Sequence, residues 1–336
     1  MVEPMMEVED LTKHFPVKGG LLGTQTIGHV RAVDGVSFTI GEGETLALVG
    51  ESGCGKTTTA RLILGLWKPT RGSVSLDGRD IHALDSQHRH WYRTSVQAVF
   101  QDPWASLSPR MRVRDIVAET LVVNRRVSRQ EVRESVAATL KKVGMEPWHG
   151  DLFPHEFSGG QRQRIALGSA LITEPRLIVL DEPVSALDVS VRAQVINLLK
   201  DLQNELGTSY LLISHDLETV RYVAHRIAVM YMGQIVESGT AEQVFANPQH
   251  PYTRALFDSI LPSHPKHRRS GPIIHGELQS PIDPPAGCRF RARCPHAMDI
   301  CTHTPPTRES EPGHIAVCHL DGPNIAKIPR LERNPI

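Results

Sequence analysis

The chain has 336 residues, of which 40% are hydrophobic and 22% are charged. Such a chain can bury a large core, which excludes disorder throughout and suits one large domain with an appendage. The chain has 37 lysine and arginine residues and 37 aspartate and glutamate residues. This balanced net charge does not indicate nucleic acid or an anionic membrane as the main partner. No apolar run approaches the ~18 residues of a spanning helix, and no secretory signal begins the sequence, so we expect a cytoplasmic chain.

Short apolar runs in the stretches ETLALVG, RLIVLDEP and SYLLISHD predict buried strands of a mostly parallel sheet. Helical spacing of apolar residues predicts helices within residues 128–144 and residues 191–206. Ser128 and Glu131 form a capping-box pattern at the first helix, and Gly207 is placed to end the second. We therefore predict an α/β fold.

The segment GESGCGKT, residues 50–57, matches the pattern of a phosphate-binding loop and follows the first predicted strand. Its glycines let consecutive backbone N–H groups surround phosphate oxygens at the start of the next helix. We expect Lys56 to reach the β- and γ-phosphates and the hydroxyl of Thr57 to bind Mg²⁺. Cys54 has no other cysteine nearby in the sequence and is interpreted as a small filler within the loop. The predicted ATP contacts in this segment are Ser52, Gly53, Cys54, Gly55, Lys56, Thr57 and Thr58.

The segment FSGGQRQR, residues 157–164, carries two adjacent glycines after Ser158 and before a predicted helix. This pattern makes a second helix start that can bind an anion. One chain cannot easily direct both helix starts at the same phosphate.

Charged side chains follow two of the predicted strands. Asp181 is placed to hold Mg²⁺ through its water shell, while Glu182 can polarise an attacking water. His215 can donate a hydrogen bond to a γ-phosphate or hold the base in place. A charged turn or a single histidine at a strand end is commonly structural, but the preceding phosphate-binding loop favours catalytic roles.

With these motifs in this order, the chain resembles the ATP-binding subunits of ABC transporters over almost its whole length. The resemblance implies a P-loop nucleotide-binding domain in residues 1–245, with a mixed sheet and a helical subdomain at about residues 102–172. Two such domains pair head to tail in that family. The residues expected to face ATP bound by the partner are Ser158, Gly159, Gly160 and Gln161.

The same resemblance assigns four further positions. Gln101, in FQDP, is expected to touch Mg²⁺ or the attacking water, and Asp188, in SALD, is expected at the dimer seam. Phe15 matches the aromatic residue that stacks on adenine, although core packing is an alternative because an insertion after it shifts the usual spacing. Ser169 stands where the family commonly has an arginine, a change that leaves the phosphate contacts intact.

The stretches VFQDPWASLSPRMRV and HPYTRALFDSILP resemble the second ATPase of dipeptide and oligopeptide uptake transporters. This implies ATP and Mg²⁺ as cofactors, and as partners a paralogous ATPase, two membrane permeases and an extracytoplasmic substrate-binding protein. We expect attachment to the cytoplasmic face of the membrane through the permeases, and no nucleic acid. Nickel, glutathione and opine-like substrates are alternative cargoes. An exporter, or a soluble ABC ATPase of DNA repair or translation, is an alternative of another class.

Prolines recur in the predicted C-terminal domain, residues 246–336, so we expect irregular structure with short helices. Its cysteines follow the pattern C-x5-C-x6-C-x16-C, which lacks the close pairs of common zinc sites. Iron–sulfur clusters accept wider spacings. The four residues are Cys288, Cys294, Cys301 and Cys318.

The resemblance associates this tail with a 4Fe–4S cluster. Zinc and metal-free or disulfide-forming thiols are the alternatives, although a reducing compartment argues against disulfides. A bound metal would supply folding energy that a core-poor tail lacks. Arg289, Arg291 and Arg293 lie among the cysteines, either to offset the charge of a cluster or as a solvated basic strip.

Overall fold

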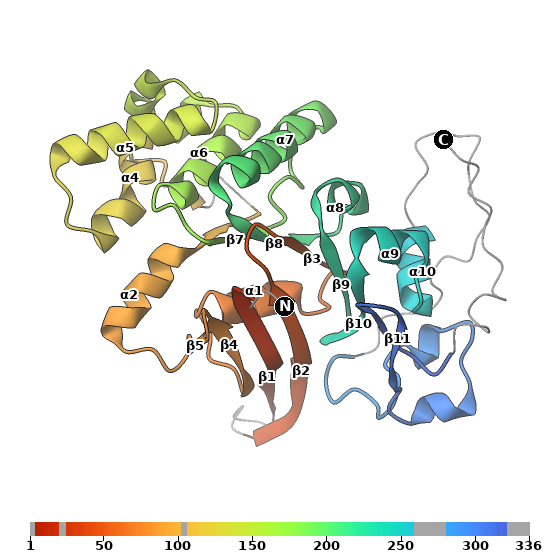
Figure 1. Ribbon diagram of the computed structural model, residues 1–336. Helices are drawn as coiled ribbons and strands as arrows, with labels where there is room; N and C mark the ends of the chain where they lie inside the picture. The colour runs from red at the N-terminus through yellow and green to blue at the C-terminus, as the bar shows by residue number, and fades with distance from the viewer. Residues whose placement is uncertain (1–3, 20–24, 102–105, 259–279, 321–336) are drawn as a thin grey trace.

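The computed structural model describes residues 4–19, 25–101, 106–258 and 280–320, and Figure 1 shows their arrangement. Within them, the larger sheet has the strand order β11-β12-β10-β9-β3-β8-β7-β6. The five strands from β9 to β6 are parallel, and the remaining strands continue the sheet in antiparallel pairs. The predicted mixed sheet is therefore confirmed. Its strands are β3 (Thr45–Val49), β6 (Val96–Val99), β7 (Leu177–Asp181), β8 (Ser209–Ser214), β9 (Arg226–Tyr231), β10 (Gln234–Thr240), β11 (Thr307–Glu311) and β12 (His314–Val317).

The central strands of this sheet are apolar on both faces. Every residue of β3, β7 and β8 is buried, which confirms the three strands predicted from apolar runs. Successive side chains of a strand point to opposite faces. Leu46 and Leu48 accordingly pack into one apolar cluster, whereas Ala47 and Val49 pack into the other. Both faces of the sheet are thus covered by other elements, as buried parallel strands require.

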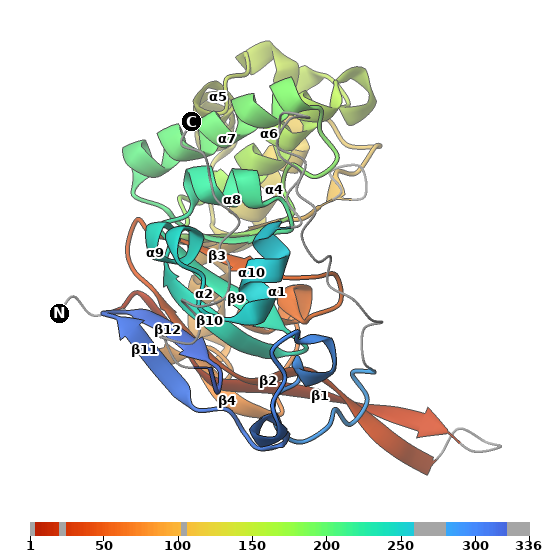
Figure 2. The same ribbon diagram turned by 90° about the vertical axis from the view of Figure 1, so that its right-hand side faces the viewer.

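A smaller antiparallel sheet packs on one face of the larger sheet. Its order is β2-β1-β4-β5, and its apolar residues share a cluster with α1 and with Leu46 and Leu48 of β3. The long strands β1 and β2 form a hairpin whose far end projects from the body in Figure 2. The strands are β1 (Met6–Gly19), β2 (Gln25–Ile40), β4 (Arg71–Leu76) and β5 (Arg79–Asp80).

Helices α4, α5 and α6 form a group at one end of the molecule, beside α7 (Figure 1). The predicted helix after Ser128 is confirmed as α5, where Ser128 and Glu131 form the expected capping box. The predicted end of α7 is also confirmed, because Gly207 adopts a left-handed conformation with φ of 68°. The helices are α1 (Lys56–Ile63), α2 (Ser86–Ser95), α4 (Val113–Asn124), α5 (Arg129–Lys142), α6 (Gly159–Leu171), α7 (Val189–Leu206), α8 (Leu217–Val223), α9 (Ala241–Ala246) and α10 (Pro251–Asp258).

The C-terminal segment contains short 3₁₀ turns and one hairpin. The turns are η4 (Arg291–Arg293) and η5 (Asp299–Thr302), with η1 (Pro147–Asp151) and η2 (Pro154–Glu156) earlier in the chain. Strand β12 pairs with β10, so the hairpin of β11 and β12 extends the larger sheet. The expectation of irregular structure missed this hairpin. All residues of β11 are exposed, so its sequence lacks the alternation that would have revealed a strand.

Candidate functional site

The predicted phosphate-binding loop lies between β3 and α1, and its glycines are required by close backbone contacts. A Cβ atom on Gly50 would lie 2.2 Å from the carbonyl oxygen of Met230, and one on Gly55 would lie 2.2 Å from that of Ala32. Gly50 and Gly55 also have positive φ values of 152° and 115°. No other residue type fits these two positions without displacing the neighbouring strands.

Lys56 lies buried within this loop. Its Nζ atom donates hydrogen bonds to the carbonyl oxygens of Gly50, at 2.8 Å, and of Glu51, at 2.9 Å. The Sγ atom of Cys54 lies 3.7 Å from the same ammonium, and burial raises the pKa of the Cys54 thiol. The ammonium is therefore held at the loop by its backbone, and Cys54 packs beneath it.

Two of the three predicted Mg²⁺ positions lie together although they come from separate elements. The hydroxyl of Thr57, at the start of α1, hydrogen-bonds to the carboxylate of Asp181, at the end of β7. Burial raises the pKa of Asp181 and the adjacent charge of Glu182 adds to this rise, while the Thr57 hydrogen bond opposes it. A divalent cation beside Asp181 would offset the cost of the buried carboxylate charge, so this pair suits Mg²⁺.

Three predicted catalytic residues converge although they lie far apart in the sequence. The Nε2 atom of Gln101 donates to one carboxylate oxygen of Glu182 at 2.8 Å. The Nδ1 atom of His215 lies 2.9 Å from the other oxygen. Glu182 adopts a left-handed backbone conformation with φ of 50°, a strained state that often accompanies functional sites. The carboxylate of Glu182 is thus held from both sides.

The predicted partner-facing segment forms the exposed start of α6. Ser158 and Gln161 form a reciprocal capping box, and the serine, Gly159 and Gln161 are all exposed. A Cβ atom on Gly160 would lie 2.2 Å from Cγ1 of Val191 in α7, so this glycine permits close helix packing. The start of α6 is therefore accessible to another chain, with its backbone fixed by its own cap.

Two family models match separate parts of this chain. Residues 33–185 match the ABC transporter model, and residues 236–301 match the C-terminal region of oligopeptide/dipeptide transporters. The chain is 46% identical over 316 residues to the dipeptide transport ATP-binding protein DppF of Escherichia coli (strain K12), covering 94% of each chain. It belongs to the ABC transporter ATPases.

Other relatives of this ABC ATPase agree in family and fold. It is 48% identical over 318 residues to the oligopeptide transport ATP-binding protein OppF of Salmonella typhimurium (strain LT2), covering 94% of this chain and 95% of that one. Among solved structures, the ATP-binding cassette MJ0796, described as a dimer in a post-hydrolysis state bound to ADP and Pi, has a TM-score of 0.61. That cassette is 29% identical and covers 70% of this chain, with 99% of its own length matched.

Three other positions named from the sequence make local contacts in the ABC ATPase. Asp188 caps α7, since its carboxylate accepts hydrogen bonds from the backbone of Val191 and from Ser190. The half-buried ring of Phe15 packs edge-on against Trp67, with 5.2 Å between ring centroids, and its contact with adenine stays a prediction. Ser169 donates a 3.3 Å hydrogen bond to the carbonyl of Ile116, which joins α6 to α4.

The four C-terminal cysteines of the ABC ATPase meet at one small cavity, which Phe290 and His250 also line. All are free thiols; Cys301 and Cys318 are buried, and the other two are half-buried. Burial raises the pKa of Cys288 and Cys318, and raises that of Cys294 to about 12. In the described part of the chain, no group of three or more histidine, cysteine or acidic side chains is arranged to hold a metal ion.

Sequence reasoning missed two contacts that connect this C-terminal segment to the phosphate-binding loop. The hydroxyl of Tyr252 accepts a hydrogen bond from the backbone N–H of Glu51, and Arg293 pairs with the Glu51 carboxylate. Tyr252 lies in the stretch HPYTRALFDSILP and Arg293 lies among the tail arginines, but nothing in either pattern indicates a contact with Glu51. In the described residues, no helix combines the length and apolar character needed to cross a membrane.

Proposed function

We propose that this ABC ATPase binds MgATP at the loop containing Lys56 and hydrolyses it to power the import of dipeptides and oligopeptides. The observation that carries the catalytic part is the placement of Glu182 between Gln101 and His215, beside the pair of Thr57 and Asp181. The cargo follows from the relatives, whose names describe dipeptide and oligopeptide transport. These names favour peptides over nickel, glutathione or opine-like substrates.

The catalytic group suggests how hydrolysis proceeds. In the proposed site, Lys56 leaves the loop carbonyls to contact phosphate oxygens, and Thr57 and Asp181 hold Mg²⁺. Bound Mg²⁺ neutralises charge that develops on the phosphates. Glu182 polarises the attacking water, while the hydrogen bonds from Gln101 and His215 orient its carboxylate.

The accessible start of α6 supports a paired arrangement. We infer that Ser158, Gly159, Gly160 and Gln161 contact ATP held by a paralogous ATPase, with Asp188 at the seam. Two permeases and an extracytoplasmic substrate-binding protein complete the proposed transporter. In this arrangement the chain lies at the cytoplasmic face of the membrane and attaches through the permeases.

We further propose that the four C-terminal thiols hold a 4Fe–4S cluster. Their common cavity supports this proposal, because each cysteine of such a cluster binds a different iron and the ligands need not converge on one ion. A single zinc ion requires four converging ligands, so zinc is the weaker alternative. When bound, the cluster links four segments of a tail that has few apolar contacts of its own.

The Glu182→Gln variant tests the proposed hydrolysis. Glutamine cannot accept the proton of the attacking water, so we expect the assembled transporter to lose about a hundredfold or more in ATP hydrolysis at this site. ATP binding should remain, because Lys56 and Thr57 are unchanged. The measurement compares phosphate release with retention of labelled ATP. Hydrolysis equal to that of the wild type would contradict the assignment of Glu182.

A further inference from the structure

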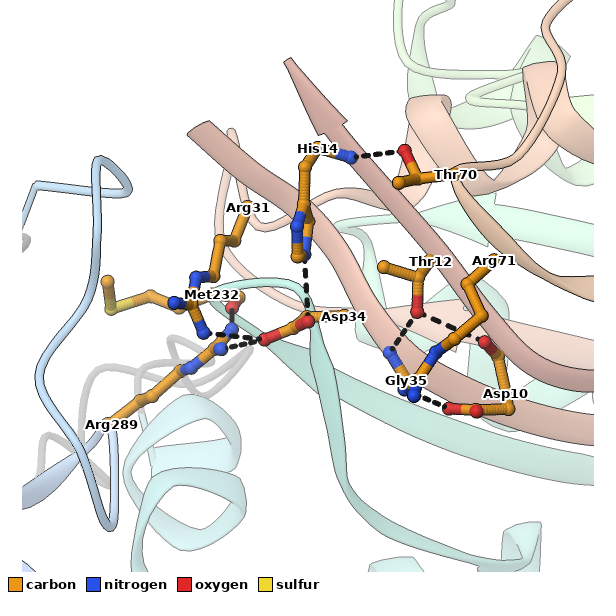
Figure 3. A network of polar contacts seen from close by, with 10 residues as sticks. All are labelled: Asp10, Thr12, His14, Arg31, Asp34, Gly35, Thr70, Arg71, Met232 and Arg289. Carbon is orange, nitrogen blue, oxygen red and sulfur yellow. Dashed lines mark hydrogen bonds and ion pairs between the residues drawn. The ribbon is translucent and has the colours of Figure 1, made fainter. Parts of the chain in front are cut away.

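Two arginines that neighbour the cysteines reach into the nucleotide-binding part of the molecule. Arg289, next to Cys288, donates to the carbonyl oxygen of Met232 and to the carboxylate of Asp34, as Figure 3 shows. Arg293, next to Cys294, pairs with Glu51. The side chains of the two arginines are only 6% and 7% exposed. These buried pairs tie the cysteine cavity to the β1–β2 hairpin and to the phosphate-binding loop.

Glu51 is held by the C-terminal segment at two points. Its carboxylate receives two parallel hydrogen bonds from Arg293, at 2.8 Å and 3.0 Å, in the fork geometry that favours a fixed orientation. Its backbone N–H donates to the hydroxyl of Tyr252 at 2.8 Å. The carbonyl of the same residue accepts from Lys56 at 2.9 Å. The C-terminal segment therefore fixes the residue that positions the phosphate-binding lysine.

The charge of Glu51 makes this contact important for nucleotide binding. Glu51 is the second residue of a loop proposed to surround a triphosphate, where an unpaired carboxylate would repel the ligand. Arg293 neutralises this carboxylate, and its guanidinium carbon lies 5.9 Å from the centroid of the Tyr231 ring. Loss of Arg293 would leave a half-buried negative charge free to turn toward the phosphates.

We propose that Arg293 is a positioning residue for ATP, which acts by holding Glu51, and that Tyr252 supports it through the loop backbone. The cysteine cavity is thereby mechanically joined to the phosphate-binding loop. This inference rests on the proposed nucleotide site at Lys56. It assigns to the C-terminal segment a part in ATP binding in addition to any part in assembly.

The test measures the Kd of ATP for the full-length chain by equilibrium titration. Arg293→Gln should weaken binding about tenfold, since it removes a charge-assisted pair and leaves the carboxylate unpaired. The double variant Glu51→Gln with Arg293→Gln should bind within about twofold of Glu51→Gln alone, because it no longer carries the free carboxylate. Arg291→Gln is the matched control, since this exposed arginine lies in the same turn and should bind ATP normally.

Two further variants separate the possible outcomes. Tyr252→Phe removes only a hydroxyl, and it should weaken ATP binding about threefold even if Arg293→Gln folds poorly. Normal ATP binding by both Arg293→Gln and Tyr252→Phe would overturn the inference. If Glu51→Gln alone binds ATP as the wild type does, a double variant as weak as Arg293→Gln alone would also overturn the inference, because the arginine would then serve only to fold the tail. If the wild type binds ATP no better than Lys56→Ala, the proposed nucleotide site itself fails.

Discussion

At the scale of single residues, Asp34 joins the hairpin of β1 and β2 to the C-terminal segment. Its carboxylate lies 2.8 Å from Nε2 of His14 and also accepts from Arg289. We expect Asp34→Asn to reduce the free energy of unfolding by about 2 kcal/mol at neutral pH, because Arg289 would stay buried without its counter-charge. Urea unfolding of the full-length chain measures this change. Asp10→Asn is the control, since its pair with Arg71 is exposed and should contribute little.

The contribution of Asp34 should also depend on pH. Burial raises the pKa of Asp34, but hydrogen bonds from His14 and Arg289 outweigh this effect and hold the pKa below its ordinary value of 3.8. A depressed pKa stabilises the folded state above the ordinary value, and this stabilisation is lost as the pH falls through the folded pKa. The difference between the wild type and Asp34→Asn should therefore shrink as the pH falls below 3.8. A difference that does not change with pH would contradict this account.

The candidate catalytic residues could be named from the sequence, whereas the arginine contacts could not. Lys56, Asp181 and Glu182 belong to short motifs whose chemistry is readable from residue type and spacing. Arg293 and Glu51 are separated by 242 positions, and only the folded chain brings them together. The sequence allowed a solvated basic strip for the three tail arginines. Two of them are instead buried in ion pairs with the body, and only Arg291 is exposed.

At the scale of elements, the four-cysteine segment carries the next prediction. We expect anaerobically purified protein to be brown, with iron and acid-labile sulfide in equal amounts. Cys301→Ser should lose most of the iron, because Cys301 is buried and lines the cavity where the proposed cluster would bind. Cys54→Ser should keep the iron, because Cys54 lies in the phosphate-binding loop. A colourless protein that contains one zinc ion would contradict the cluster.

The long hairpin shows why some elements escape sequence analysis. The sequence analysis expected only an insertion after Phe15. In the structure this stretch belongs to β1 and β2, which pair with each other up to Gly19 and Gln25. Residues 20–24, between the two strands, lie outside the described residues. The glycines and charged residues of this stretch give no regular alternation. The hairpin also contacts the C-terminal segment, since the backbone N–H of Arg31 donates to the carbonyl of Pro281 and the backbone N–H of Asp283 donates to that of His29. Pairing across some 250 positions leaves no local signal.

At the scale of the whole molecule, the ABC ATPase fold was predictable because its motifs lie at the ends of buried strands, and these strands belong to one sheet. Parallel strands place their carboxyl ends along one edge, which brings the loop after β3 close to Asp181 and His215. The junction with the C-terminal segment was not predictable. Strand β12 pairs with β10, and Arg289 and Arg293 enter the body, through contacts that no local pattern encodes.

The central claim is that this chain supplies ATP hydrolysis for peptide import. The most direct measurement is uptake of a labelled dipeptide into vesicles that contain the permeases, both ATPases, internal MgATP and the external binding protein. We expect uptake that requires ATP, that unlabelled peptides inhibit, and that falls sharply with Glu182→Gln. Uptake that persists without ATP, or transport of nickel or glutathione but not of peptides, would contradict the account.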